Sequence, residues 1–237
     1  MTMRVLDLFS GIGGFSLGLE RAGMKTVAFC EIDPFCQKVL RKHWPDVPIY
    51  DDIKDVVNVK ADVVVGGYPC QPFSEAGKRE GENDSRHLWP EMLRIIRETR
   101  PSWAIAENVV GHVTLGLDQV LHDLEGEGYT ARPLVIPACA VDAPHLRARV
   151  WILAYTESQR CHNGDDSQNV RQADRTGNTS TDKGGLIRGL EARRWASEPA
   201  IPRVGHGFSS RVDRNRALGN AVVPQIPELI GRAIMSC

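Results

Sequence analysis

Residues 63–74 read VVVGGYPCQPFS. An apolar, β-branched run ends at two glycines and passes directly into a Pro-Cys-Gln-Pro turn. The run predicts a buried parallel strand, and the glycines permit an abrupt turn and the close approach of a ligand to the backbone. We therefore expect Cys70 at the carboxyl end of a central strand, where open α/β sheets bind their ligands. A single cysteine is more often a small buried hydrophobe, but the prolines and glutamine around this one do not extend a core strand.

A second strand-and-turn pattern covers residues 4–16, which read RVLDLFSGIGGFS. A helical stretch follows to about Ala22, and strand, glycine turn and helix together are typical of a phosphate- or nucleotide-binding unit. The dinucleotide fingerprint requires a third glycine where this chain has Ser16, and no lysine completes a P-loop. The pattern indicates a nucleotide-type cofactor, with tight packing of helix on strand as the alternative explanation for the glycines.

Acidic residues follow the next two predicted strands. The strand over residues 25–30 ends at Glu31, which lies 20 residues past Gly11, where a carboxylate typically bonds a ribose diol. Asp33 is suited to capping the following helix, whose first turn accepts Pro34. We assign Glu31 to the ribose and Asp33 to the cap. Residues 49–53 predict a short strand and turn with an acid at its tip, which on its own indicates only a solvated turn.

Charged side chains also follow later strands. Glu107 comes directly after the predicted strand at residues 103–106, a position well placed for chemistry, and a satisfied loop residue is the alternative. Arg147 and Arg149 are two residues apart and are expected to share one face of an extended segment. Arginine is suited to bidentate contacts, so this pair predicts an anion clamp.

The composition changes after residue 154. Residues 155–189 are rich in small polar residues and cannot build a large core. Residues 155–216 carry 11 Lys and Arg against 8 Asp and Glu, although the whole chain has a net charge of -1 and thus no global field toward nucleic acid. Basic residues beside Trp195 and Phe208 suit nucleic acid, and a solvated face is the alternative.

Several classes of protein are excluded by what the sequence does not contain. None of the 6 cysteines forms a C-x-x-C pair, so we expect no metal site. No apolar run approaches the ~18 residues of a membrane span, and we recognise no secretory leader. We therefore expect a cytoplasmic protein that does not contact a membrane.

In chain order, these segments resemble the motifs of the cytosine-C5 DNA methyltransferase family. Residues 7–15 resemble its cofactor loop, and residues 66–74 resemble its Pro-Cys-Gln catalytic loop. Residues 107–109 match its Glu-Asn-Val motif, Arg147-x-Arg149 its paired arginines, and residues 219–223 its C-terminal motif. Several motifs in the family's order are far more specific than any one of them.

The resemblance implies an α/β fold, a Rossmann-like methyltransferase sheet with helices on both faces, plus a small irregular target-recognition region. Residues 1–154 would form the catalytic and cofactor-binding domain, and residues 155–210 the target-recognition region. Residues 211–237 would return to the catalytic domain. The target-recognition region is short and polar for this family.

The resemblance also implies the reaction. S-adenosylmethionine would give its methyl group to C5 of a cytosine flipped out of duplex DNA, through a covalent bond between Cys70 and C6, and S-adenosylhomocysteine would be released. The expected partners are double-stranded DNA and a cognate restriction endonuclease, in a monomeric bacterial or phage-encoded enzyme. A tRNA cytosine-C5 methyltransferase and a non-catalytic DNA-binding homologue are the alternatives.

Carried over by motif, the resemblance assigns roles to individual residues. The catalytic residues would be Cys70, Glu107, Arg147 and Arg149. The cofactor-binding residues would be Phe9, Ser10, Gly11, Ile12, Gly13, Gly14, Glu31, Ile32, Asp52, Ile53, Pro69, Leu88, Asn220 and Ala221. The residues that contact DNA would be Gln71, Ser74, Arg86, Arg193 and Arg194.

Overall fold

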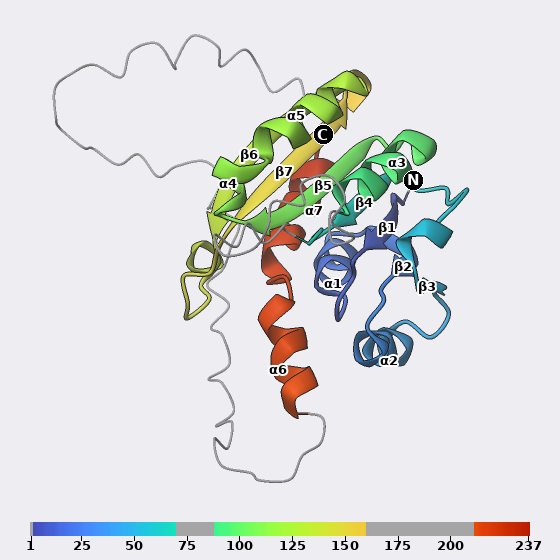
Figure 1. The fold of residues 1–237 in the computed structure, drawn as a ribbon, viewed down its shortest axis with the longest axis vertical. Coiled ribbons are helices and arrows are strands. Elements are labelled where there is room, and N and C mark those ends of the chain that lie inside the picture. Colours follow the sequence, from blue (N-terminus) through green and yellow to red (C-terminus); the bar gives the residue numbers. More distant parts are fainter. Residues whose placement is uncertain (1, 70–87, 160–210) are drawn as a thin grey trace, which may run out of the picture.

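The computed structural model describes residues 2–69, 88–159 and 211–237, which form a sheet flanked by helices (Figure 1). The strand order in this 7-stranded sheet is β3-β2-β1-β4-β5-β7-β6. The strands β1 to β5 pair with one another in parallel, and β7 runs antiparallel to both β5 and β6. The strands are β1 (Arg4–Leu8), β2 (Lys25–Cys30), β3 (Ile49–Tyr50), β4 (Val63–Gly66), β5 (Trp103–Val109), β6 (Tyr129–Pro137) and β7 (Ala148–Thr156).

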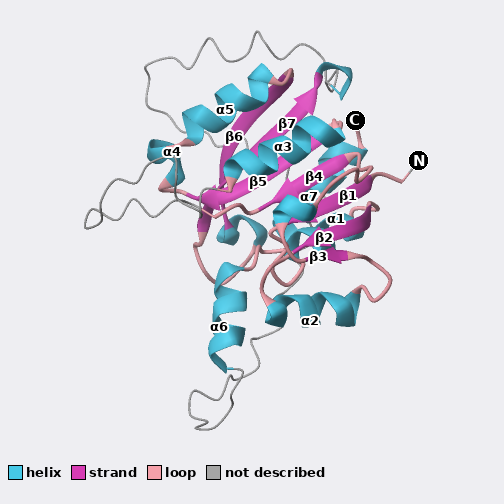
Figure 2. Cartoon of the chain, turned by 45° about the vertical axis from the view of Figure 1, so that its right-hand side comes forward, coloured by secondary structure: helices cyan, strands magenta, loops and turns pink. Residues whose placement is uncertain are grey.

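Helices cover both faces of the sheet, so the predicted α/β class is confirmed (Figure 2). The α-helices are α1 (Gly14–Arg21), α2 (Pro34–His43), α3 (Trp89–Thr99), α4 (His112–Leu115), α5 (Leu117–Gly126), α6 (Arg211–Asn220) and α7 (Gln225–Met235). Short 3-10 turns are η1 (Ile53–Asp55), η2 (Ala138–Val141) and η3 (Glu157–Gln159). None of the helices in the described part of the chain combines the length and apolar character that a membrane span requires.

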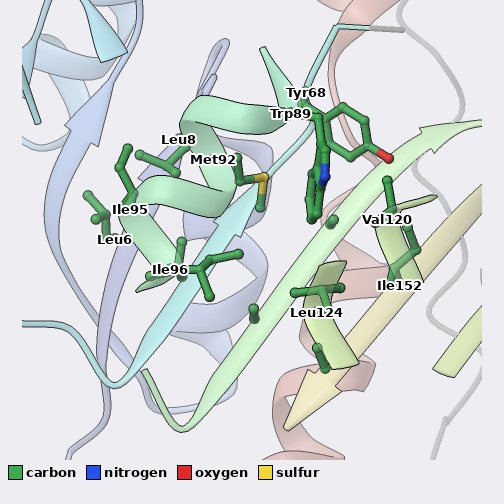
Figure 3. Close-up of a cluster of buried hydrophobic side chains, with 14 of the residues drawn as sticks. Leu6, Leu8, Tyr68, Trp89, Met92, Ile95, Ile96, Val120, Leu124 and Ile152 are labelled. Carbon is green, nitrogen blue, oxygen red and sulfur yellow. The ribbon is translucent and has the colours of Figure 1, made fainter. Parts of the chain in front are cut away.

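The central strands are buried on both faces because their side chains alternate between two hydrophobic clusters. Leu6 and Val64 point to the cluster formed with α3 and α5, part of which is shown in Figure 3. Val5, Val63 and Val65 point to the opposite cluster, formed with α1 and α7. This explains why residues 63–65 read as a continuous apolar run rather than as an alternating one.

The last helix packs on the first one at very short range. A Cβ atom at Gly18 of α1 would lie 2.2 Å from the carbonyl oxygen of Pro224, and one at Gly231 of α7 would lie 2.8 Å from Cβ of Ala22. Glycine is therefore required at these positions for the two backbones to approach. The segment at residues 211–237 is thereby held beside the glycine turn that precedes α1.

Some local predictions are wrong. Glu107 does not follow a strand that ends at residue 106, because β5 continues to Val109. The composition of residues 219–224 favours one turn, but Gly219 and Asn220 are the last residues of α6. Glycine and asparagine are frequent at helix ends as well as in turns, so composition does not separate the two cases. Arg147 and Arg149 do not share one extended segment, because Arg147 precedes β7 with φ 27°.

Candidate cofactor and catalytic site

A cavity of about 600 Å³ opens at the carboxyl ends of β1, β2, β4 and β5. Its wall contains Phe9, Glu31 and Gly67, which directly follow β1, β2 and β4, and Asn108 near the end of β5. β1 lies between β2 and β4 in the sheet. The chain therefore passes from β1 to β2 in one direction across the sheet and from β4 to β5 in the other. Such a switch point is where open parallel sheets bind ligands, and the volume is typical of a small-molecule site.

The glycine turn after β1 is bonded to the end of β2. Gly11 and Gly13 have φ of 54° and 85°, and Phe9, although not glycine, has φ 52°. Ser10 donates its backbone N–H to the carbonyl of Cys30 at 3.1 Å. This places the turn and the β2 end against one another as a single wall of the cavity.

Glu31 closes this wall. Its Oε2 accepts the N–H of Gly11 at 2.6 Å and its Oε1 accepts the N–H of Asp33 at 2.8 Å. Each carboxylate oxygen has a second lone pair, so the side chain, which is buried against the cavity, retains the capacity to accept ligand hydroxyls. Asp33 accepts the N–H of Phe35 at 2.8 Å, and its predicted role as the cap of α2 is confirmed.

Glu107 and the two arginines lie together at the other end of the cavity. The Nε atom of Arg149 is 3.1 Å from Oε1 of Glu107. Burial raises the pKa of Glu107, and the positive charges of Arg149 and Arg147 oppose that shift. Burial and the charge of Arg149 lower the pKa of Arg147, which donates from Nη2 to the carbonyl of Ala221 at 2.9 Å. The carboxyl is thus held in a partly desolvated, positively charged pocket, where its proton affinity is raised by burial.

Most of the predicted cofactor residues line this cavity, and Ile12 and Gly13 are the two that do not. A Cβ atom at Gly13 would lie 2.7 Å from the ring of Trp44, so this glycine is explained by close packing. Asn108, Val109 and Val222 also line the cavity; they belong to the motifs at residues 107–109 and 219–223 but were assigned no role of their own. Further lining residues that the sequence analysis did not assign to the site include Cys30, Cys36, Asp51, Lys54 and Arg216. Arg216 forms an ion pair with Asp33, which also lines the cavity.

Some predicted residues lie outside the described ranges. Pro69, the residue before Cys70, lines the cavity, as does Leu88. The predicted residues for which the structure describes nothing are Cys70, Gln71, Ser74, Arg86, Arg193 and Arg194. Their roles, and the boundaries proposed for the target-recognition region, stay predictions.

The comparisons with known proteins agree with this geometry. Residues 3–196 match the family model described as C-5 cytosine-specific DNA methylase. The chain belongs to this family.

Within the family, the chain is 39% identical over 165 residues to the Type II methyltransferase M2.BsuMI of Bacillus subtilis, which covers 64% of this chain and 42% of that protein. It is 33% identical over 178 residues to the Type II methyltransferase M.AquIA of Picosynechococcus, covering 65% of this chain and 72% of that protein. The aligned part is thus less than half of the first relative's length. The structure of Schizosaccharomyces pombe Dnmt2 matches with a TM-score of 0.57 at 22% identity, over 65% of this chain and 51% of that one. This likeness supports the fold alone.

A buried carboxyl, Asp7, holds the start of α1 beside the glycine turn. Asp7 of β1 is fully buried, and its Oδ2 accepts from Oγ of Ser16 at 2.7 Å. Burial raises the pKa of Asp7 to about 8, the hydrogen bonds from Ser16 oppose the shift, and the charges of Glu31 and Glu20 add to it. The native state therefore binds Asp7's proton through a pH range in which the unfolded chain has lost it.

This gives a pH-dependent prediction. Because the pKa of Asp7 is raised on folding, its protonated form stabilises the fold below about pH 4, and that contribution is lost as pH rises toward about 8. Asp7→Asn removes the titration and keeps an acceptor for Ser16. Urea unfolding between pH 5 and 8 should show the variant gaining stability relative to wild type as pH rises. The ratio of the two unfolding equilibrium constants should change by at most tenfold per pH unit, which is the limit for one proton.

Asp62→Asn is the control for this measurement. The ion pair with Arg4 lowers the pKa of Asp62, so its contribution is already complete above pH 5 and its difference from wild type should be constant. A constant difference for Asp7→Asn as well would mean that Asp7 is ionised in the native protein.

Proposed function

We propose that this protein transfers a methyl group from S-adenosylmethionine to C5 of a cytosine extruded from duplex DNA, through a covalent bond between Cys70 and C6. One observation carries the proposal. A single cavity joins the glycine turn and Glu31 to Glu107 and the arginine pair, and Pro69, which precedes Cys70, lies in its wall.

The residues at the β1 and β2 ends fit the cofactor. A Cβ atom at Gly11, which lines the cavity, would meet nothing within 4 Å, so there is open space beside this residue. In the proposed mode Glu31 accepts the ribose hydroxyls, while Phe9, Ile32 and Ile53 pack on the adenine and Asp52 lies near its amino group. The backbone of residues 10–14 holds the methionine part, and Leu88, Asn220 and Ala221 complete the site.

The other end of the cavity fits the target base. C5 of cytosine is a poor nucleophile until C6 has been attacked, and a cysteine thiolate is a strong, soft nucleophile for that step. We assign this attack to Cys70, while Glu107 binds the N3 and N4 edge and provides a proton to N3 as charge develops. Its burial-raised pKa favours the protonated form that this step requires.

Bound S-adenosylmethionine would supply the electrophilic methyl group on its sulfonium. Once C5 carries the methyl group, loss of the C5 proton to a base, which we assign to water, allows the Cys70 sulfur to be eliminated and N3 to return its proton to Glu107. Arg149 forms an ion pair with Glu107, and both arginines line the cavity. In the proposed mode their positive charge acts on the base and favours the thiolate of Cys70. Each group ends the cycle in its starting protonation state.

Duplex DNA is the proposed substrate because the target base must leave the stack to reach this cavity, at a cost of a few kcal/mol. We assign Gln71, Ser74, Arg86, Arg193 and Arg194 to DNA contacts. We further propose a monomer in the bacterial cytoplasm, with a restriction endonuclease of the same specificity as its biological partner.

Methyl transfer from labelled S-adenosylmethionine tests the proposal. Duplex DNA should gain label, and bisulfite sequencing should show protected cytosines at a defined site. Glu107→Gln should keep cofactor affinity and lose about 10²-fold or more in rate, because the amide cannot exchange the N3 proton. Label in tRNA but not DNA would contradict the substrate, and wild-type rates for Glu107→Gln would remove this residue from the chemistry.

The cofactor assignment has its own test. Glu31→Ala removes the acceptor for ribose and also the bond that holds the Gly11 N–H, so the dissociation constant of S-adenosylhomocysteine should rise roughly 10- to 100-fold by calorimetry. Glu125→Ala, an exposed acid in α5 that does not line the cavity, is the matched control. An unchanged constant for Glu31→Ala would rule out the ribose contact.

A further inference from the structure

The pairing of β4 with β5 ends before the end of β5, and a side chain connects the two chain segments beyond it. The last pair in their ladder is Gly66 with Ala106. Beyond it, Nδ2 of Asn108 donates to the carbonyl of Tyr68 at 3.1 Å, and Oδ1 of Asn108 accepts the N–H of Val109 at 2.8 Å. Asn108 is 4% exposed, so this amide connects the two chain segments within the protein rather than through solvent.

Tyr68 is also held through its ring and its hydroxyl. Its ring packs on Trp89 with centroids 5.2 Å apart, and Figure 3 shows the two rings side by side. Its Oη lies 2.6 Å from Nε2 of His112, a short hydrogen bond between buried groups. Trp89 is anchored in turn, because its Nε1 donates to Oδ2 of Asp123 at 2.8 Å.

The His112 ring is backed by the chain on its other side. A Cβ atom at Gly116 would lie 3.0 Å from Cε1 of His112, so glycine at this position leaves the space that the ring occupies. Since buried polar partners are costly to separate, the Tyr68–His112 bond is expected to persist in the native state.

These contacts lie at both ends of the segment that carries Cys70. Tyr68 is two residues before Cys70, and Trp89 begins α3. Asn108 and His112 come from the chain that directly carries Glu107. Residues beside the carboxylate thus hold the residue from which the chain continues to Cys70.

We propose that Asn108 and His112 are positioning residues that, by holding the carbonyl and hydroxyl of Tyr68, fix the start of the chain leading to Cys70 relative to Glu107. The inference rests on the proposed function, because it concerns the geometry of that reaction. Small displacements of reacting groups reduce rates strongly, with about 1 Å costing up to about 10²-fold. The effect is expected in the chemical step, since none of these contacts involves the residues assigned to the cofactor ribose.

Single-turnover methyl transfer to duplex DNA tests this role. Tyr68→Phe keeps the ring contact with Trp89 and loses the hydroxyl, and His112→Phe removes the other partner. Each should lower the single-turnover rate tenfold or more, with unchanged affinity for S-adenosylhomocysteine and for DNA.

The double variant should be no slower than either single variant, because both substitutions remove the same hydrogen bond. His112→Gln, whose amide nitrogen reaches near the Nε2 position, should recover part of the rate. Asn108→Asp, which keeps the acceptor and loses the donor to Tyr68, should slow the same step.

Tyr129→Phe is the matched control. Tyr129 is equally buried, at 4% exposed, and its hydroxyl donates to the carbonyl of Pro101 at 2.8 Å away from the cavity. It should lose comparable stability and keep the wild-type rate. Wild-type rates in Tyr68→Phe and His112→Phe would overturn the positioning role alone. A wild-type protein that methylates no cytosine would overturn the proposed function and this inference with it.

Discussion

The parallel pairing of β4 with β1 on one side and β5 on the other is the constraint on which the site depends. Parallel strands end at one edge of a sheet, so the glycine turn, the chain that leads to Cys70 and Glu107 must all emerge there. The valines of β4 make this position stable, because they are fully buried against helices on both faces. A one-residue slip of β4 would exchange its two faces and move the start of the cysteine loop away from Glu107.

The cavity combines two electrostatic environments. At the end of β2, Glu31 is held by backbone N–H groups and faces the cavity with unused acceptor capacity. At the end of β5, burial favours a protonated Glu107, while Arg149 favours its charged form and fixes its orientation. Arg147 links this end to the C-terminal segment through Ala221. One acid is thereby suited to binding hydroxyls and the other to exchanging a proton, as two separate tasks in one reaction require.

The sequence predicted elements best where local pattern and tertiary packing agree. The bounds of β2 are as expected, Asp33 caps α2 as its chemistry suggested, and Glu31 follows β2 and lines the cavity. The positive φ of Arg147 could not be predicted, since it depends on how residues 138–147 return to β7. The Tyr68–His112 bond joins residues 44 apart and has no local signature. Side-chain contacts of this kind follow from the packed fold, and sequence spacing does not reveal them.

A covalent trap tests the central claim most directly. Duplex DNA containing 5-fluorocytosine at the recognised position, incubated with the protein and S-adenosylmethionine, cannot lose a proton from C5, so elimination of the cysteine is blocked. The account predicts a stable protein–DNA adduct whose mass includes the transferred methyl group and whose linked peptide contains Cys70, and it predicts none with Cys70→Ala. An adduct that maps to another residue, or methylated DNA with no adduct on the fluorinated duplex, would contradict it.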